Sequence, residues 1–426
     1  MAKAVSASNY EILSISKNDK EVRLQGKTTS FDYYESVLSP NITVNLTVKD
    51  GPNAVKYDKK FDKQERTGSI YNALPITGGE KIKFKIRNSI ATLDFGRKPL
   101  TVSGASNMAQ DDKTSSIMIQ LVSPLAVSNQ ESVVYKKYDG NIGDNVKKLI
   151  KEYLNVRSNK MTIDDTSNSY SFVGNSDSVF DVICWLAAKS TSETDSAGFF
   201  FYETQDGLNY RSIDKLIAQE PVASYFKTDA AAKNIDNDTN DYKIISVVVD
   251  KNQNIINSMK SGIYQSRNIY FNPKTFKEEE IVYTFSDKQL KRSLGKSAEV
   301  PEMKDGKFTR THFDILDIGA YNTTVAGSEN NDPDDWQWQS TMRYNILFSQ
   351  KLKLQVPCNP NLKAGDTINC DFAIITEDSK EQGTNDPVQS GKYLIIDLCH
   401  HFDPTRSITS MTLVRDTYGI YTKKNR

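Results

Sequence analysis

The histidines come first, because imidazole is both a common metal ligand and a general base near neutral pH. The sequence holds only three of them, His312, His400 and His401. His400 and His401 are adjacent in a segment typical of a strand, so their side chains point to opposite faces and cannot chelate one metal ion together without distortion. His312 is distant in sequence. We therefore expect three packed or surface histidines.

An acidic stretch, "SENNDPDDWQW", offers oxygen ligands with the spacing that opens a calcium-binding loop. Asn330, Asp332 and Asp334 match the first ligand positions of such a loop. Asp335 occupies the position that requires glycine, and Thr341 occupies the position of the closing glutamate. We therefore expect no calcium site and interpret the stretch as an exposed loop.

The remaining candidates for chemistry are equally weak. Four cysteines are scattered without a CxxC pair, which favours buried free thiols over a disulfide or a zinc site; they are Cys184, Cys358, Cys370 and Cys399. The sequence has no GxxxxGK[ST], GxGxxG, HExxH or GxSxG motif. We predict no catalytic, cofactor-binding or metal-binding residue, and no cofactor.

Composition narrows the class of protein. A chain of 426 residues is too long for one compact core, so about two to four domains are expected. Basic and acidic residues number 54 each, so the chain lacks the basic field of a nucleic-acid-binding protein. We find no apolar run long enough to cross a membrane and no signal peptide, and expect a soluble chain that folds in a cytoplasm.

The first part of the chain is patterned as β structure. Residues 42–48, 82–86 and 117–121 alternate apolar and polar side chains with period two, and turn residues separate them. Several such strands predict a barrel or sandwich with one buried face over residues 1–125.

The second part changes to a helical period. Apolar residues recur at helical spacing over residues 146–154, with Asp144 as the expected N-cap, and over 179–187, with Asn175 or Ser176 starting the helix. The segment "AGFFFYETQDGLNYRSID" then reads as a hairpin with Asp206 and Gly207 in its turn. We expect residues 199–202 to form the centre of the sheet that both helices cover.

The third part returns to β structure with polar interruptions. Residues 252–262 predict a short helix ended by Gly262, and strands are expected before and after it. Residues 288–339 are polar and irregular and are expected to form an insertion or arm. Four strands of a meander are expected after residue 340.

The order and spacing of several of these segments resemble the central baseplate hub subunit of T-even-like contractile-tailed bacteriophages. The similar segments are "FDYYESVLSPNITVNLTVKDG", "SIYNALPITGGEKIKFKI", "YKKYDGNIGDNVKKLIKEYL", "SVFDVICWLAAKS", "GFFFYETQDGLNYRSIDKLI", "AGDTINCDF", "GKYLIIDLCHHFD" and "TSMTLVRDTYG". The resemblance extends from about residue 30 to about residue 420, and residues 288–340 have no counterpart in it.

The resemblance implies a mainly β fold with an α+β insertion: two β-barrel domains similar to the tail-tube protein, and a mixed helix-on-sheet domain. On this basis we divide the chain into a first barrel (1–125), a mixed domain (126–230), the first part of a second barrel (231–287), the polar arm (288–339), and the rest of the second barrel with a C-terminal tail (340–426).

The resemblance also implies a function. Hub subunits form a homotrimer whose six similar barrels join a threefold cell-puncturing spike to the sixfold tail tube. Its expected partners are the spike, the tube and tube-initiator proteins and the baseplate wedge proteins. Genome DNA would pass through the lumen without specific binding, and the protein would belong to the virion after assembly in the host cytoplasm.

Two alternatives stay open at this point. Some tail hubs carry a peptidoglycan hydrolase domain, although no stretch of this chain remains for one. The chain could instead be a β-rich carbohydrate-binding tail protein or adhesin, with Trp336 and Trp338 on one face of a strand as its aromatic platform.

Overall fold

A computed structural model of the chain describes most of its residues. The described ranges are 3–18, 20–58, 65–111, 114–193, 196–227, 240–250, 255–262, 264–273, 275–284, 292–295, 308–317, 319, 330, 333–373 and 385–417. Within these ranges, no helix has the length and apolar character needed to cross a membrane.

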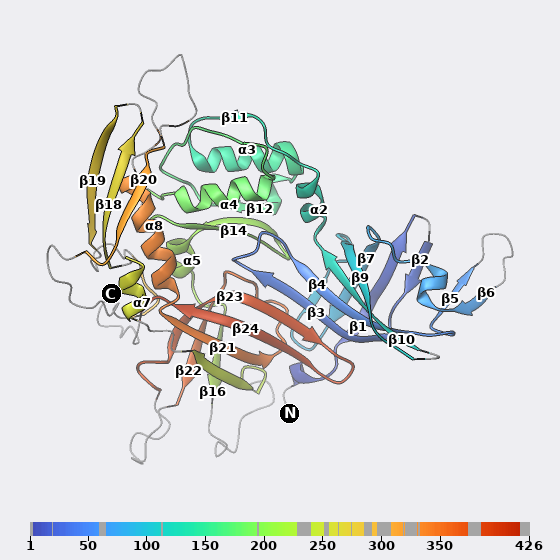
Figure 1. Cartoon of the computed structure of the whole chain (residues 1–426). Helices are drawn as coiled ribbons and strands as arrows, with labels where there is room; N and C mark the ends of the chain where they lie inside the picture. The colour runs from blue at the N-terminus through green and yellow to red at the C-terminus, as the bar shows by residue number, and fades with distance from the viewer. Residues whose placement is uncertain are drawn as a thin grey trace, which may run out of the picture.

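One large sheet of 14 strands runs through the molecule (Figure 1). Its main path is β17-β21-β24-β23-β3-β4-β10-β9-β7-β1-β2, while β8 branches from β7 and the pair β22 and β16 from β23. The helices of residues 124–218 gather in a separate region between β10 and β16. The expected fold class, mainly β with an α+β insertion, is therefore confirmed.

The first barrel consists of the strands at the N-terminal end of this path. They are β1 (Asn9–Lys17), β2 (Lys20–Arg23), β3 (Thr28–Ser36), β4 (Thr43–Asp50), β7 (Lys81–Arg87), β8 (Thr92–Asp94), β9 (Leu100–Gln110) and β10 (Ser115–Val122). Short elements accompany them: η1 (Lys3–Val5), β5 (Val55–Asp58), β6 (Glu65–Gly68) and α1 (Ile70–Ala73). The period-two prediction is confirmed, since Val44, Leu46 and Val48 of β4 are fully buried in one core.

The second barrel has a hydrophobic core of its own. Its strands are β16 (Ala223–Lys227), β17 (Ser246–Asp250), β21 (Gln350–Pro357), β22 (Thr367–Phe372), β23 (Gly391–Phe402) and β24 (Ser407–Arg415). The two barrels share a seam, because β3 pairs antiparallel with β23 from Phe31 opposite Phe402 to Ser36 opposite Asp397.

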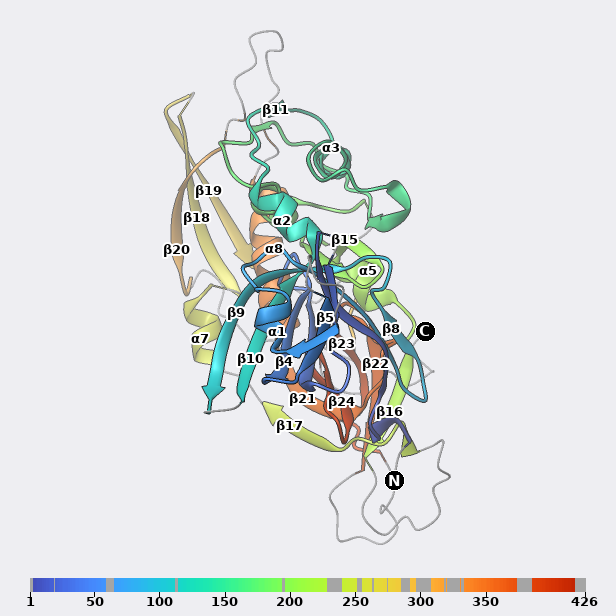
Figure 2. The same ribbon diagram turned by 90° about the vertical axis from the view of Figure 1, so that its right-hand side faces the viewer.

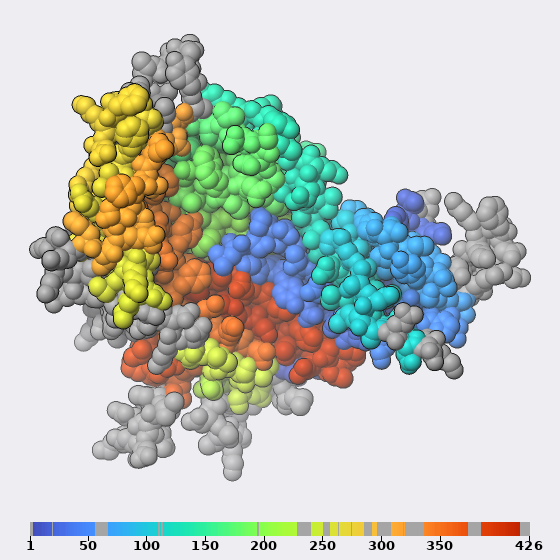
Figure 3. Space-filling model, viewed as in Figure 1, coloured from blue at the N-terminus to red at the C-terminus, as the bar shows by residue number. Residues whose placement is uncertain are grey.

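The mixed domain lies above both barrels, as the turned view and the space-filling view show (Figures 2 and 3). Its elements are α2 (Pro124–Gln130), β11 (Lys137–Tyr138), α3 (Ile142–Leu154), η2 (Ser158–Lys160), β12 (Met161–Ile163), β13 (Phe172–Val173), α4 (Val179–Lys189), β14 (Phe199–Thr204), β15 (Gly207–Ser212) and α5 (Ile213–Ala218).

Both predicted helices of this domain exist, but each begins at a different cap. The side chain of Asn141, not of Asp144, accepts the capping hydrogen bond of α3. Ser178 caps α4, while Asn175 and Ser176 adopt positive φ angles of 55° and 65° in the turn before it. The spacing of apolar residues predicted the buried helix faces correctly. The N-caps were ambiguous because several polar residues near each helix start could act as the cap.

The aromatic hairpin is core, as expected, but β14 is not the centre of its sheet. The order is β12-β15-β14, so β15 is central. β14 is nevertheless buried on both faces, because Phe199 and Phe201 pack with the helices while Phe200 and Tyr202 pack toward the second barrel.

The hairpin turn also differs by one residue from the expected one. Thr204 pairs with Gly207, so Gln205 and Asp206 form the turn and Gly207 is the first residue of β15. Glycine is needed at position 207 because its φ is +141° and a Cβ atom there would lie 2.2 Å from the Lys160 carbonyl oxygen.

A third sheet stands beside the mixed domain. It contains β19 (Lys277–Thr284), β18 (Gln265–Asn272) and β20 (Thr311–Ile315), and the predicted short helix α7 (Ile255–Lys260) precedes it. Of the range 231–287 that the sequence places in the second barrel, β17 joins the large sheet whereas β18 and β19 belong to this separate one.

The acidic stretch near residue 333 was predicted as an exposed loop, and that prediction is wrong. Residues from Pro333 onward form the helix α8 (Pro333–Leu347), which packs between the third sheet and the mixed domain (Figure 1). Trp338, Met342 and Ile346 recur every four residues and are buried, so one helical face lies hidden among polar residues.

The helix-on-sheet packing generates a stability prediction. Replacing Ile183, which is fully buried on α4, with alanine should lower the free energy of unfolding by about 2–5 kcal/mol, and Phe200→Ala by about 3–5 kcal/mol. Val173→Ala is the matched control, because Val173 is 50% exposed in the same domain and its loss should change stability by less than about 1 kcal/mol. Urea unfolding followed by tryptophan fluorescence measures all three. Midpoints equal to that of the unaltered chain for both core variants would contradict the packing.

Candidate functional site

The three parts of the chain meet at the carboxyl group of Glu35, at the end of β3. Its Oε1 accepts hydrogen bonds from the Tyr33 hydroxyl and from the backbone N–H of Gln205, both at 2.7 Å. Its Oε2 accepts the backbone N–H of Ala364 at 2.9 Å. Glu35 thus links the first barrel to the hairpin turn of the mixed domain and to the loop before β22.

Glu35 is 2% exposed, so its environment decides its charge. Burial raises the pKa of the Glu35 carboxyl to about 7, although the three hydrogen bonds that it accepts favour the charged form. The Glu35 carboxyl therefore connects three segments of the chain, and the strength of its hydrogen bonds depends on whether it is ionised.

The hairpin turn makes further contacts with the second barrel. The Gln205 side chain donates to the Pro360 carbonyl oxygen at 2.9 Å, and Asp206 pairs with Lys363 at 2.6 Å. Gly365 has a φ of +87°, and a Cβ atom there would lie 2.2 Å from the Tyr202 hydroxyl. The loop before β22 therefore fits closely against the hairpin, and a larger residue at position 365 would separate them.

The two adjacent histidines lie on the seam between the barrels, on opposite faces as predicted. His400 is 1% exposed; its Nδ1 lies 2.8 Å from the Thr409 hydroxyl, and its ring stacks on Tyr33 across the β3–β23 pairing. Burial lowers the pKa of His400 to about 4, so it is neutral at physiological pH. His401, on the other face, contacts Asp32 at 2.5 Å and also pairs with Asp403.

A buried cation joins α8 to its surroundings. Arg343 is fully buried and its guanidinium group lies between two carboxylates, Asp416 at 2.8 Å and Asp214 at 2.5 Å. Asp416 follows β24 and Asp214 lies in α5. One side chain therefore fixes the helix to the second barrel and to the mixed domain together.

The expected platform of Trp336 and Trp338 does not exist. Both residues lie on α8, where positions two apart point to nearly opposite sides. Trp338 is 6% exposed and donates to the Tyr270 hydroxyl at 2.7 Å. The Trp336 ring covers the ammonium group of Lys189 at 4.3 Å. Both rings hold neighbouring elements in place, so they form no common surface for a sugar.

The other candidate residues are dispersed. His312 lies in β20, with its ring 4.3 Å from that of Trp338. All four cysteines are free, but Cys184 is exposed rather than buried because it lies on the outer side of α4. Asn330 hydrogen-bonds Ser171 of the mixed domain, and Asp332 lies outside the described residues. No group of three or more His, Cys, Asp or Glu side chains suited to a metal ion occurs in the described ranges.

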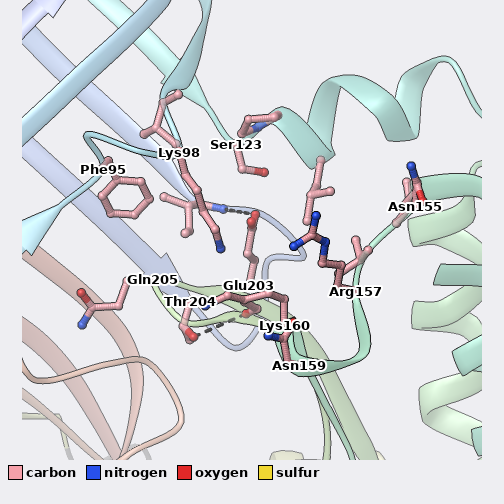
Figure 4. A pocket seen from close by; sticks show the side chains of 17 residues that line it. Phe95, Lys98, Ser123, Asn155, Arg157, Asn159, Lys160, Glu203, Thr204 and Gln205 are labelled. Carbon is pink, nitrogen blue, oxygen red and sulfur yellow. Dashed lines mark hydrogen bonds between the residues drawn. The ribbon is translucent and has the colours of Figure 1, made fainter. Parts of the chain in front are cut away.

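A pocket of about 430 Å³ opens between the first barrel and the mixed domain (Figure 4). Glu203 of β14 lies in it, 7% exposed, and accepts the backbone N–H of Ile42 at 3.4 Å. Burial raises the pKa of Glu203 to about 7, while a hydrogen bond from Ser123 opposes the rise. Lys98, Arg157 and Lys160 also line the pocket.

Sequence reasoning missed Glu35, Glu203 and Arg343. Glu35 and Glu203 each lie among apolar and aromatic residues of a strand. A charged residue in such a segment could have indicated a buried acid. No signal identified their partners, because Gln205, for example, lies 170 positions from Glu35.

Comparison with known proteins finds a sequence relative over about four fifths of the chain and structures with a similar fold. No family model matches it. The chain is 21% identical over 379 residues, 82% of its own length and 84% of the other, to the probable baseplate hub protein gp334 of Vibrio phage KVP40.

Two crystal structures share the fold. The tail protein from Neisseria meningitidis MC58 matches with a TM-score of 0.54 at 11% identity, over 96% of this chain and 97% of that one. The 43 kDa tail protein of prophage MuSo2 from Shewanella oneidensis matches with a TM-score of 0.50 at 10% identity, over 96% and 100%. The resemblance to a phage baseplate hub protein is confirmed.

The buried carboxyl of Glu203 generates a pH prediction. Its pKa is higher in the folded chain, about 7, than the ordinary 4.5, so the folded state retains a proton that the unfolded state releases. Glu203 should therefore make the chain lose stability as pH rises from 4.5 to 7. Glu203→Gln removes this titration, and the stability of the variant relative to the unaltered chain should rise by roughly 3 kcal/mol across that window.

Urea unfolding at half-unit pH steps measures the difference. Glu220→Gln is the matched control for the loss of one carboxylate, because Glu220 is exposed and lies outside the pocket. A constant difference between Glu203→Gln and the unaltered chain from pH 4.5 to 7 would contradict a buried, protonated Glu203.

Proposed function

We propose that this chain is a structural subunit of a phage tail baseplate, a homotrimeric hub adaptor that joins a threefold cell-puncturing spike to a sixfold tail tube. The observation that carries the proposal is the β3–β23 seam, which joins the two barrels into one sheet within each subunit. The likeness to the probable baseplate hub protein of Vibrio phage KVP40, over four fifths of both chains, supports it.

Symmetry explains why two barrels per chain suit this role. Three copies of a two-barrel subunit present six similar barrels around an axis, so one ring can match threefold and sixfold neighbours. The division into two barrels and a mixed domain belongs to this proposal, with the sequence boundaries at 125, 230, 287 and 339 adjusted so that β16 joins the second barrel and β18 and β19 form a separate sheet. The ring would be part of the virion and would assemble in the host cytoplasm.

The proposed partners follow from this position. The spike would bind one end of the ring, the tube and tube-initiator proteins would bind the other, and baseplate wedge proteins would surround it. Genome DNA would pass through the lumen. A net charge of zero suits a channel that must not hold DNA tightly, since DNA binding depends on neutralising its phosphates with basic residues.

The proposal includes no enzymatic activity. The buried carboxyl groups of Glu35, Asp214 and Asp416 accept backbone N–H groups or pair with Arg343, which are the contacts of structural joints. Relatives are known as hub and tail proteins, which supports a structural role.

A zymogram tests the absence of hydrolase activity. The purified chain should leave peptidoglycan and chitin gels uncleared, because its buried carboxyl groups serve as joints between elements. Lysozyme in a neighbouring lane provides the positive control. A clearing band that disappears when a single carboxylate is substituted would establish a hydrolase and refute a purely structural hub.

Mass measurement tests the trimer. Coexpressed with the spike protein of the same phage, the chain should form a ring containing three copies of the 48.0 kDa subunit, about 144 kDa before the mass of the spike is added. A permanent ring should bury on the order of 2,000 Å² or more at each contact. Light scattering and particle imaging give the mass and the number of barrels around the axis.

The chain expressed without the spike serves as the control, since it shows whether the spike is needed to nucleate the ring. Six barrel densities around an open channel are expected in the coexpressed sample. A stable monomer or dimer in the presence of the spike would overturn the hub proposal.

A further inference from the structure

The pocket between the first barrel and the mixed domain has the size and shape of a site for a small ligand. Its volume of about 430 Å³ lies within the range of ligand-binding pockets. Residues before β9, the start of α2, the segment after α3 and the hairpin turn all contribute to its wall (Figure 4). A ligand there would contact both domains at once.

The inner wall of the pocket is largely apolar. Phe95, Leu100 and Leu154 line it and are at most 6% exposed, and Ile42, Pro124 and Val156 complete this surface. An apolar chain or ring would remove this wall from water, which is the main source of affinity for a small ligand.

Three cations stand around the same pocket against a single acid. Lys98, Arg157 and Lys160 line it together with Glu203, and none of the three forms an ion pair among the described residues. Figure 4 shows the side chains of Lys98 and Arg157 extending toward Glu203 from two sides. Glu203 itself is engaged by the backbone N–H of Ile42.

Partial burial of the Lys98 side chain lowers its pKa. The ammonium group of Lys160 also disfavours the charged form of Lys98. An anion placed between the two ammonium groups would relieve this repulsion and would gain charge-assisted hydrogen bonds. Cationic side chains therefore outnumber acidic ones in this pocket, and an anionic ligand would balance their charge.

We propose that this pocket binds a carboxylate carried on an apolar chain or ring, with the carboxylate at Lys98 and Lys160 and the apolar part against Phe95 and Leu154. The carboxylate can belong to a free organic acid or to the end of a polypeptide chain that inserts into the pocket. This inference does not depend on the hub proposal, since it rests on the charges and the wall of one pocket.

Titration calorimetry with matched probes tests the chemistry. Octanoate is expected to bind about tenfold or more tightly than octanol, because a hydrogen bond to a charged group contributes more than one to a neutral group. Octylammonium and inorganic phosphate should show no binding, the first because it carries the wrong charge and the second because it has no apolar part.

Variants assign the binding to this pocket. The double variant Lys98→Gln with Lys160→Gln should lose the preference for octanoate over octanol while still folding, because both lysine side chains are exposed. Lys148→Gln is the matched control: Lys148 is an exposed lysine of α3 that does not line the pocket, and its loss should leave binding unchanged.

A second arm distinguishes the two sources of the carboxylate. A short apolar peptide with a free C-terminal carboxylate is compared with the same peptide ending in an amide. Binding of octanoate alone assigns a free acid, and binding of the carboxylate peptide but not the amide assigns a polypeptide end. Equal affinity for octanoate and octanol, or an unchanged preference in the double lysine variant, would overturn the proposal.

Discussion

The antiparallel pairing of β3 with β23 is the interaction on which the rest of the structure depends. The backbone N–H and C=O groups of β3, near the N-terminus, form hydrogen bonds with those of β23, near the C-terminus. This pairing joins the two barrels into one sheet. The register is strict, because a shift by one residue would turn His400 outward and bring His401 into the core. The same register places Glu35 where it can reach both other parts of the chain.

Buried charged groups link the barrels, the mixed domain and α8, in addition to the β3–β23 pairing. Glu35 and Arg343 are both buried, and each holds segments from three parts of the chain through hydrogen bonds or ion pairs. Burying such groups is unfavourable unless their partners are all in place, so they add little net stability compared with apolar packing. What they impose is a unique arrangement, since any displacement leaves a charge buried without a partner.

The sequence predicted much of the fold for a clear reason. Period-two strands such as 42–48 and helices such as 179–187 bury a regular face, and that face is visible in the chain itself. α8 was missed because its buried positions, Trp338, Met342 and Ile346, alternate with polar residues and with a buried Arg343. The hydrogen bonds of Glu35 could not be predicted, because its partners Gln205 and Ala364 lie 170 and 329 positions away and such contacts leave no local sequence pattern.

The seam also has a consequence for synthesis. Tyr34 of β3 pairs with Cys399, so the ribosome must add some 365 further residues before the partner strand exists. At about 5–20 residues per second, this interval lasts roughly 20–70 s. During that time β3 presents an open edge, the kind of surface on which nascent chains aggregate. Asp32 and Glu35 place two charges along that edge, which keeps it hydrated until the C-terminal strand arrives.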